Sequence, residues 1–121
     1  MANANKRKGD AFELLVQRYL SERIDCERIP AGATVDRGDL WTRSCLIQCK
    51  NVKGYRLGEW IRETLQQQQD ARKALHALVI KRTRTTAPED QFVVMTLGQL
   101  RELLAHVNNC NNPAATDAQR G

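Results

Sequence analysis

Two segments of the sequence carry polar side chains that could hold a cation: Asp39 lies in one, and Gln48 and Lys50 lie in the other. An antiparallel hairpin that pairs Trp41 with Leu46 also sets Asp39 opposite Gln48, with Cβ atoms about 4.5 to 5.5 Å apart. Because side chains alternate along a strand, Lys50 shares the face of Gln48. A carboxylate and an amide carbonyl can share one divalent cation. The pattern therefore predicts a cation site beside an ammonium group, and an ordinary solvated sheet face is the alternative.

A second carboxylate, Glu13, follows Phe12 at the border of an apolar helical stripe, from which it can reach along the surface of the sheet. On spacing alone, an exposed glutamate on the helix surface is an equally good interpretation. Asp36 is the other candidate for the acidic position taken by Asp39. We prefer Asp39 because it begins the hydrophobic strand and faces Gln48 in the proposed register.

Hydrophobic periodicity predicts the elements that must position these side chains. The order αβββαββα predicts an α/β fold in which helices flank a mixed central β-sheet. We expect one domain over residues 1–107 and a disordered tail over 108–121. In chain order, the predicted elements are a helix (8–23), a strand (24–29), a loop (30–38), two hairpin strands (39–42 and 45–50), a helical pattern (57–75), two strands (77–80 and 91–95) and a helix (96–106).

The charge of the chain favours a polyanionic partner. Nineteen Lys and Arg face fourteen Asp and Glu among 121 residues, a net charge of +5, and thirteen of the cations are Arg, whose planar fork suits phosphate. The alternative is that this charge only keeps a small domain in solution. The side chains that we expect to contact a nucleic-acid backbone are Lys6, Arg7, Lys8, Thr34, Arg37, Lys53, Arg56, Arg62, Arg82 and Arg84.

Several classes of protein are disfavoured. No apolar run reaches the roughly 18 to 20 residues of a membrane span, and no apolar stretch follows the N-terminal charges to make a signal peptide. We therefore expect a cytoplasmic or nucleoid-associated protein. The four cysteines form no CxxC pair, so a zinc site is not expected. Cys45 and Cys49 fit the role of reduced, small hydrophobic residues in a buried strand.

Three motifs in this order resemble the PD-(D/E)xK nuclease superfamily. They are KGDAFE at residues 8–13, GDL at 38–40 and QCK at 48–50. The likeness covers about residues 8 to 82. It is closest to the archaeal-type Holliday junction resolvases, which open with a similar motif, and to the Mrr-like restriction endonucleases, whose signature includes an Asp followed by Gln-x-Lys.

This resemblance implies a restriction-endonuclease-like core and a magnesium-dependent endonuclease for which Mn²⁺ can substitute. Glu13 and Asp39 would be acidic metal ligands, Gln48 would replace the usual acidic residue of the third motif, and Lys50 would be the catalytic lysine. Because an amide carbonyl is neutral, we expect weak affinity for the metal when no DNA is bound.

The expected substrate is branched DNA, most simply a four-way junction. The sequence shows no helix-turn-helix or zinc finger for reading bases, so recognition of DNA shape through contacts with the backbone is the more economical interpretation. Because symmetric cutting of a junction needs two active sites, this function implies a twofold homodimer. The alternatives are an Mrr-like restriction or repair endonuclease, a DNA-binding module without catalysis, and a protein-interaction domain.

Overall fold

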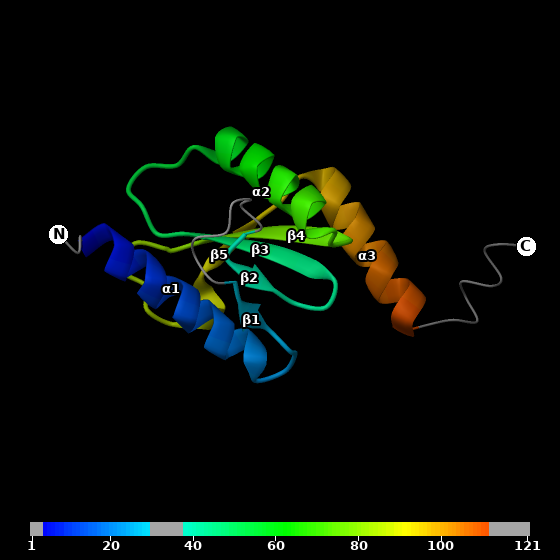
Figure 1. Cartoon of the computed structure of the whole chain (residues 1–121), viewed down its shortest axis with the longest axis horizontal. Coiled ribbons are helices and arrows are strands. Elements are labelled where there is room, and N and C mark those ends of the chain that lie inside the picture. The colour runs from blue at the N-terminus through cyan, green and yellow to red at the C-terminus, as the bar shows by residue number, and fades with distance from the viewer. Residues whose placement is uncertain (1–3, 30–37, 112–121) are drawn as a thin grey trace, which may run out of the picture.

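The computed structural model describes residues 4–29 and 38–111, which form a five-stranded mixed sheet with helices on both faces (Figure 1). This confirms the predicted α/β class and order of elements. In chain order these are α1 (Ala4–Ser21), β1 (Glu27–Arg28), β2 (Leu40–Trp41), β3 (Cys45–Lys50), α2 (Leu57–Ala71), β4 (Leu75–Ile80), the short 3-10 helix η1 (Pro88–Asp90), β5 (Phe92–Val94) and α3 (Leu97–Asn111).

The strands lie in the sheet in sequence order, from β1 at one edge to β5 at the other. The β2–β3 hairpin pairs Trp41 with Leu46 and Leu40 with Ile47, so the predicted pairing of Trp41 with Leu46 is confirmed. β2 begins at Leu40, so the predicted pairing of Asp39 with Gln48 is not part of the ladder, and the Asp39 N–H donates to the Ile47 carbonyl. β3 and β4 run parallel, and α2 is the crossover helix that joins them, as a parallel pair requires. β1 and β5 each join the sheet antiparallel to their neighbours.

Several boundaries differ from the predicted ones. The segment 24–29 pairs only at Glu27–Arg28. The predicted helix over residues 57–75 was too long, since α2 ends at Ala71. Arg72 takes a left-handed conformation with φ 57°, and its N–H donates to carbonyls of the last turn of α2. Leu75 consequently begins β4. α3 continues to Asn111, so the predicted tail is helical over residues 108–111; the rest of that tail lies outside the described residues.

The sheet has two covered faces, and they divide the side chains of β3. Ile47 and Cys49 pack with Phe12 and Val16 of α1. Gln48 and Lys50 are paired in register with Leu78 and Ile80, which pack against Trp60 of α2. Since paired residues in a sheet share a face, Gln48 and Lys50 face α2. Figure 1 shows the sheet between these two helices.

The predicted place of two cysteines in the strand is confirmed. Cys49 is buried in the core and Cys45 is half-buried, and both thiols are free. Burial raises the pKa of Cys45 to about 11 and that of Cys49 further still, so both stay protonated. Among the described residues, no helix is long and apolar enough to cross a membrane.

Gly38 sets the entry into β2, where the candidate site begins. Its φ is +87°, a conformation that glycine adopts at little cost. A Cβ at this position would overlap the Leu46 side chain. The chain therefore needs glycine here to approach β3 closely and to present Asp39 at the edge of that strand.

Candidate functional site

Asp39 is fixed against β3 by its main chain and its carboxylate. Its N–H donates to the Ile47 carbonyl at 3.2 Å, and its own carbonyl accepts from the Ile29 N–H at 3.0 Å. Its Oδ2 accepts a hydrogen bond from the Cys49 N–H at 2.8 Å. The carboxylate thus accepts the hydrogen bond that a main-chain carbonyl of β2 would otherwise accept from the Cys49 N–H. Asp39 therefore has a structural role as well as the predicted role of a ligand.

We expect Asp39→Ala to lower the free energy of unfolding by about 1 to 3 kcal/mol, because it leaves the Cys49 N–H without its acceptor. Asp39→Asn keeps an acceptor oxygen and should lose less. Urea denaturation of the two variants checks this difference. Equal stability of Asp39→Ala and the unaltered protein would show that the hydrogen bond contributes nothing. For tests of activity, Asp39→Asn is therefore the cleaner substitution.

Gln48 is a buried polar residue in the middle of the sheet. Only 8% of its surface is exposed, and its Oε1 has no hydrogen-bond partner among the described residues. A buried acceptor without a donor costs about 1 to 3 kcal/mol, and such groups are rare in folded proteins. The Gln48 carbonyl is therefore suited to accept a group from outside the chain, either a hydrogen-bond donor or a cation.

Lys50 lies two positions farther along β3, on the same face. Its Nζ is 3.2 Å from Glu63 Oε2 and 5.6 Å from the centre of the Trp60 ring. Both partners belong to α2, so the ammonium is held at the end of β3 beside the Gln48 position. The predicted grouping of Gln48 and Lys50 on one strand face is thus present.

Glu63 is a candidate site residue that the sequence analysis did not assign. Its neighbours Trp60, Thr64 and Gln67 are the buried positions of α2, and this helical spacing places Glu63 at the border of the face that covers the sheet. Its position beside the buried stripe of α2 is the feature of the sequence that could have identified Glu63. After Asp39 and Glu13, Glu63 is a third carboxylate that could be part of the site, and it lies on the side of the sheet where Gln48 and Lys50 lie.

Glu13 lies on the other side of the sheet. Its Oε1 is 3.3 Å from Arg28 Nη2, and Asp10 Oδ1 is 3.6 Å from the same nitrogen. Asp39 and Glu13 both act electrostatically on the Cys49 thiol and raise its pKa beyond the effect of burial. The structure therefore gathers Glu13, Asp39 and Arg28 around Cys49 and places Gln48 and Lys50 on the α2 face. In the described part of the chain, no group of three or more His, Cys, Asp or Glu side chains is arranged to hold a metal ion.

The Glu13 carboxyl should make stability fall as the pH rises. Burial raises its pKa above 4.5, and this effect outweighs the opposing effect of Arg28. The folded state then holds the proton more tightly than the unfolded state, so its stability declines as the pH rises from 4.5 through the raised pKa. We expect Glu13→Gln to be more stable than the unaltered protein at about pH 7 and not at about pH 4. Urea denaturation at both pH values measures this, and the same difference at both would contradict it.

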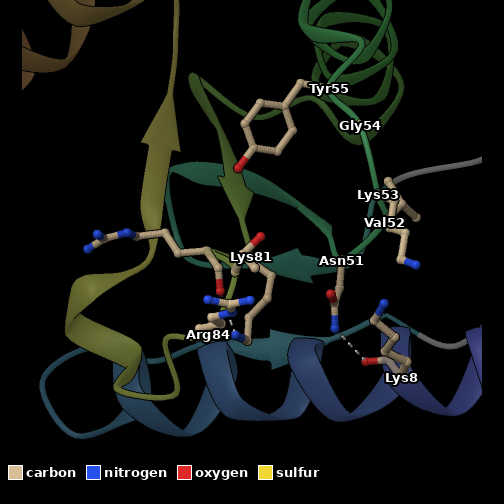
Figure 2. Close-up of a pocket in the computed structure, with 10 residues that line it drawn as sticks. Lys8, Asn51, Val52, Lys53, Gly54, Tyr55, Lys81 and Arg84 are labelled. Atoms are coloured by element: carbon tan, nitrogen blue, oxygen red, sulfur yellow. Dashed lines mark hydrogen bonds between the residues drawn. The ribbon is translucent and has the colours of Figure 1, made fainter.

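A cavity of about 540 Å³ opens at the ends of β3 and β4 (Figure 2). We call it the basic pocket, because its wall holds five cations and no carboxylate. It occupies the crevice beyond the carboxyl ends of two parallel strands, a common place for ligands in α/β sheets. The residues that line it are Lys8, Asn51, Val52, Lys53, Gly54, Tyr55, Lys81, Arg82, Thr83 and Arg84.

The basic pocket gathers only part of the predicted backbone-binding set. Lys8, Lys53, Arg82 and Arg84 line it, together with Lys81, which the sequence analysis did not single out. Arg56 pairs with Glu59 at 3.8 Å. The others do not line the pocket: Lys6, Arg7 and Arg62 are exposed on their helices, and Thr34, Asp36 and Arg37 lie outside the described residues.

Comparisons with protein-family profiles, with curated proteins and with solved structures give no match. What can be said of function therefore depends on the motifs, the topology and the geometry given above.

Proposed function

We propose that this protein is a magnesium-dependent endonuclease with a restriction-endonuclease-like core that hydrolyses phosphodiester bonds in branched DNA. The observation that carries the proposal is the pair formed by Gln48 and Lys50. A buried carbonyl without a donor and an ammonium group held by Glu63 occupy one face of the central strand β3. Asp39 is fixed at the edge of the same strand, and the basic pocket opens where that strand ends.

The side chains around β3 suit a hard divalent cation. Mg²⁺ prefers oxygen ligands and binds through one or two carboxylates together with water and substrate phosphate. Gln48 would supply one such oxygen from the α2 face, and a cation there would satisfy the acceptor that the chain leaves without a donor. Asp39 would supply a carboxylate oxygen from the edge of β3, where its Oδ2 accepts from the Cys49 N–H. Glu13 lies on the other side of the sheet from Gln48, so Glu63 is the further carboxylate on the face of Gln48. When bound, Mg²⁺ supplies positive charge to the phosphate oxygens and makes water a better nucleophile.

Lys50 is suited to act on the reacting phosphate or on the attacking water. An ammonium group has three N–H donors, and the structure gives one contact of Nζ with a carboxylate, that of Glu63. The remaining donors can stabilise charge that develops on a phosphate oxygen or orient a water molecule. Glu63 is a positioning residue in this scheme, since it acts through Lys50.

Shape recognition fits the distribution of charge. The cations of the basic pocket can contact phosphates but carry no base-reading pattern of their own. A four-way junction is the proposed substrate, and a homodimer is the proposed assembly because two strands must be cut. Exposed apolar side chains of β5 and α3, among them Val93, Leu97 and Leu104, are available for a contact between two copies.

One assay tests the function. The full chain is incubated with labelled four-way junction, duplex and single-stranded DNA, with Mg²⁺ or with a chelator. We expect cuts in the junction that depend on the metal. Binding without any cleavage would reject the endonuclease and favour the second candidate, a DNA-binding module without catalysis, for which the basic pocket is the supporting observation. Neither binding nor cleavage would reject both.

A further inference from the structure

The basic pocket has two kinds of wall, one cationic and one aromatic. Lys8 comes from α1, residues 51–55 connect β3 to α2, and residues 81–84 follow β4. Asn51 Nδ2 donates to the Lys8 carbonyl at 3.4 Å, which ties the α1 wall to the β3–α2 connection. Figure 2 shows Tyr55 reaching over the strand ends, with Lys81, Asn51 and Lys8 on the opposite side of the opening.

Within residues 4–29 and 38–111, four of the five cations of the pocket have no carboxylate partner. In the described part of the chain, none of the ion pairs includes Lys8, Lys53, Lys81 or Arg84. The Lys81 ammonium donates to the Arg82 and Thr85 carbonyls, which fix its position without removing its charge. Several cations of one sign in a concave surface focus a positive potential, which attracts phosphate.

The Arg82 guanidinium is engaged by contacts within the protein, although Arg82 lines the pocket. Its guanidinium donates to the Asp90 carbonyl at 3.2 Å and lies 4.5 Å from the centre of the Phe92 ring. These contacts hold the β4–η1 connection against β5. The groups available to a phosphate are therefore those of Lys8, Lys53, Lys81 and Arg84.

Tyr55 gives the pocket an aromatic surface. The residue is 54% exposed, and its ring contacts Trp60, with 6.2 Å between the ring centres and 65° between the ring planes. An edge contact of this kind orients the ring and leaves area for a further stacking partner. The bases of a duplex are already stacked on one another, whereas an unpaired base offers a free face to an aromatic side chain.

We infer that the basic pocket binds an unpaired nucleotide of a DNA strand, with the base stacked on Tyr55 and the adjoining phosphates on Lys8, Lys53, Lys81 and Arg84. A volume of about 540 Å³ lies within the range of about 300 to 1,000 Å³ that small-ligand sites occupy. The inference rests on the proposed function for its biological role: a four-way junction is base-paired throughout, so the nucleotide that enters the pocket is one whose base pair opens at the branch point. The binding itself does not require cleavage.

Binding of a labelled oligothymidylate and of a labelled blunt duplex, both measured by fluorescence anisotropy in chelator, tests the inference. We expect Tyr55→Leu to weaken binding of the single strand by roughly 5- to 150-fold and to leave the duplex unchanged. Tyr55→Phe keeps the ring and should bind like the unaltered protein. Tyr19→Leu is the matched control, because Tyr19 is also exposed but lies on α1 outside the pocket.

The salt dependence of single-strand binding tests the contribution of the pocket's cations. For a single strand, each phosphate contact that is lost should reduce the slope of log K against log salt by about 0.7. Lys53→Ala and Arg84→Ala should each show this reduction, and Arg18→Ala, an exposed cation in the last turn of α1, should not. Circular dichroism and thermal melting verify that each variant is folded.

Two results would overturn the inference: equal loss of single-strand and duplex binding in Tyr55→Leu, or no loss of either in the folded variant. Cleavage of junctions with either result would leave the proposed endonuclease intact. The expected binding pattern without metal-dependent cleavage would reject the endonuclease and keep the nucleotide site. The two proposals therefore fail separately.

Discussion

Lys50→Ala should slow the metal-dependent cleavage of branched DNA by about 10²- to 10³-fold, the usual cost of removing one group that stabilises charge in a transition state. Lys50 contributes the ammonium group that lies on the Gln48 face of β3, held at 3.2 Å by Glu63. Single-turnover cleavage of a four-way junction by excess protein measures the chemical step without the contribution of product release.

The fold should survive this substitution. The ion pair is partly exposed, with 21% of the Lys50 side chain and 42% of the Glu63 side chain accessible, and such pairs contribute about 0 to 1 kcal/mol. The contact of the ammonium with the Trp60 ring adds about 0.5 to 1 kcal/mol. Thermal melting should therefore show a small decrease in stability, well below what would unfold the domain.

Lys73→Ala is the matched control for Lys50→Ala. Its Nζ lies 4.7 Å from the centre of the Trp41 ring, so it also stacks on an aromatic side chain, but it lies beside Trp41 and Arg43 at the hairpin turn and does not line the basic pocket. We expect unchanged cleavage by this variant. Full cleavage by a folded Lys50→Ala protein would remove Lys50 from the mechanism, whatever the control shows.

The hairpin register could be predicted from the sequence because a tight turn and the two-residue period of strands leave little freedom. Pairing Trp41 with Leu46 follows from the turn at Arg43 and Ser44, and the structure has this pairing. The strand faces followed in the same way, since Gln48 and Lys50 must alternate with Ile47. Local geometry alone was sufficient for these features.

The rest of the site depends on how helices pack on the sheet, which the sequence pattern did not resolve. Which turn of α2 meets the end of β3 decides whether Glu63 reaches Lys50, and this is a tertiary contact. The same is true of Glu13, whose carboxylate meets Arg28 from the edge strand β1. Lys81 could not be predicted as a pocket residue from the sequence, because its place in the pocket depends on the parallel pairing of β3 with β4.

The burial of Gln48 was also hidden in the sequence. A strand with alternating polar residues is expected to have one solvated face, but α2 covers this one, and Gln48 is left 8% exposed. A long polar side chain without a donor on its carbonyl is a cost to folding. The chain keeps this residue in the central part of its sheet, where an apolar side chain would pack more favourably, and a ligand role gives a reason for it.

Gln48→Glu should make the stability of the protein depend on Mg²⁺. In chelator at about pH 7, a carboxylate at this buried position has lost most of its hydration, so we expect a loss of about 3 kcal/mol or more and a melting temperature lower by about 10 to 20 °C. A cation bound at the site would pair with the new charge. A Mg²⁺ concentration near 100 times the Kd would then restore about 2.7 kcal/mol. Thermal melting with chelator and with Mg²⁺ measures both effects.

The pH dependence and an apolar control separate this interpretation from a general defect in packing. Burial raises the pKa of a carboxyl group, so in chelator the loss of stability of Gln48→Glu should shrink at low pH, where the side chain is protonated and resembles glutamine in shape.

Gln48→Met removes the acceptor altogether. It should be as stable as the unaltered protein or more stable by about 1 to 2 kcal/mol, with no response to Mg²⁺. If Gln48→Glu loses stability and Mg²⁺ restores none of it, the amide does not face a cation site. The donor set proposed around β3 would then be wrong even if Lys50 proved essential for cleavage.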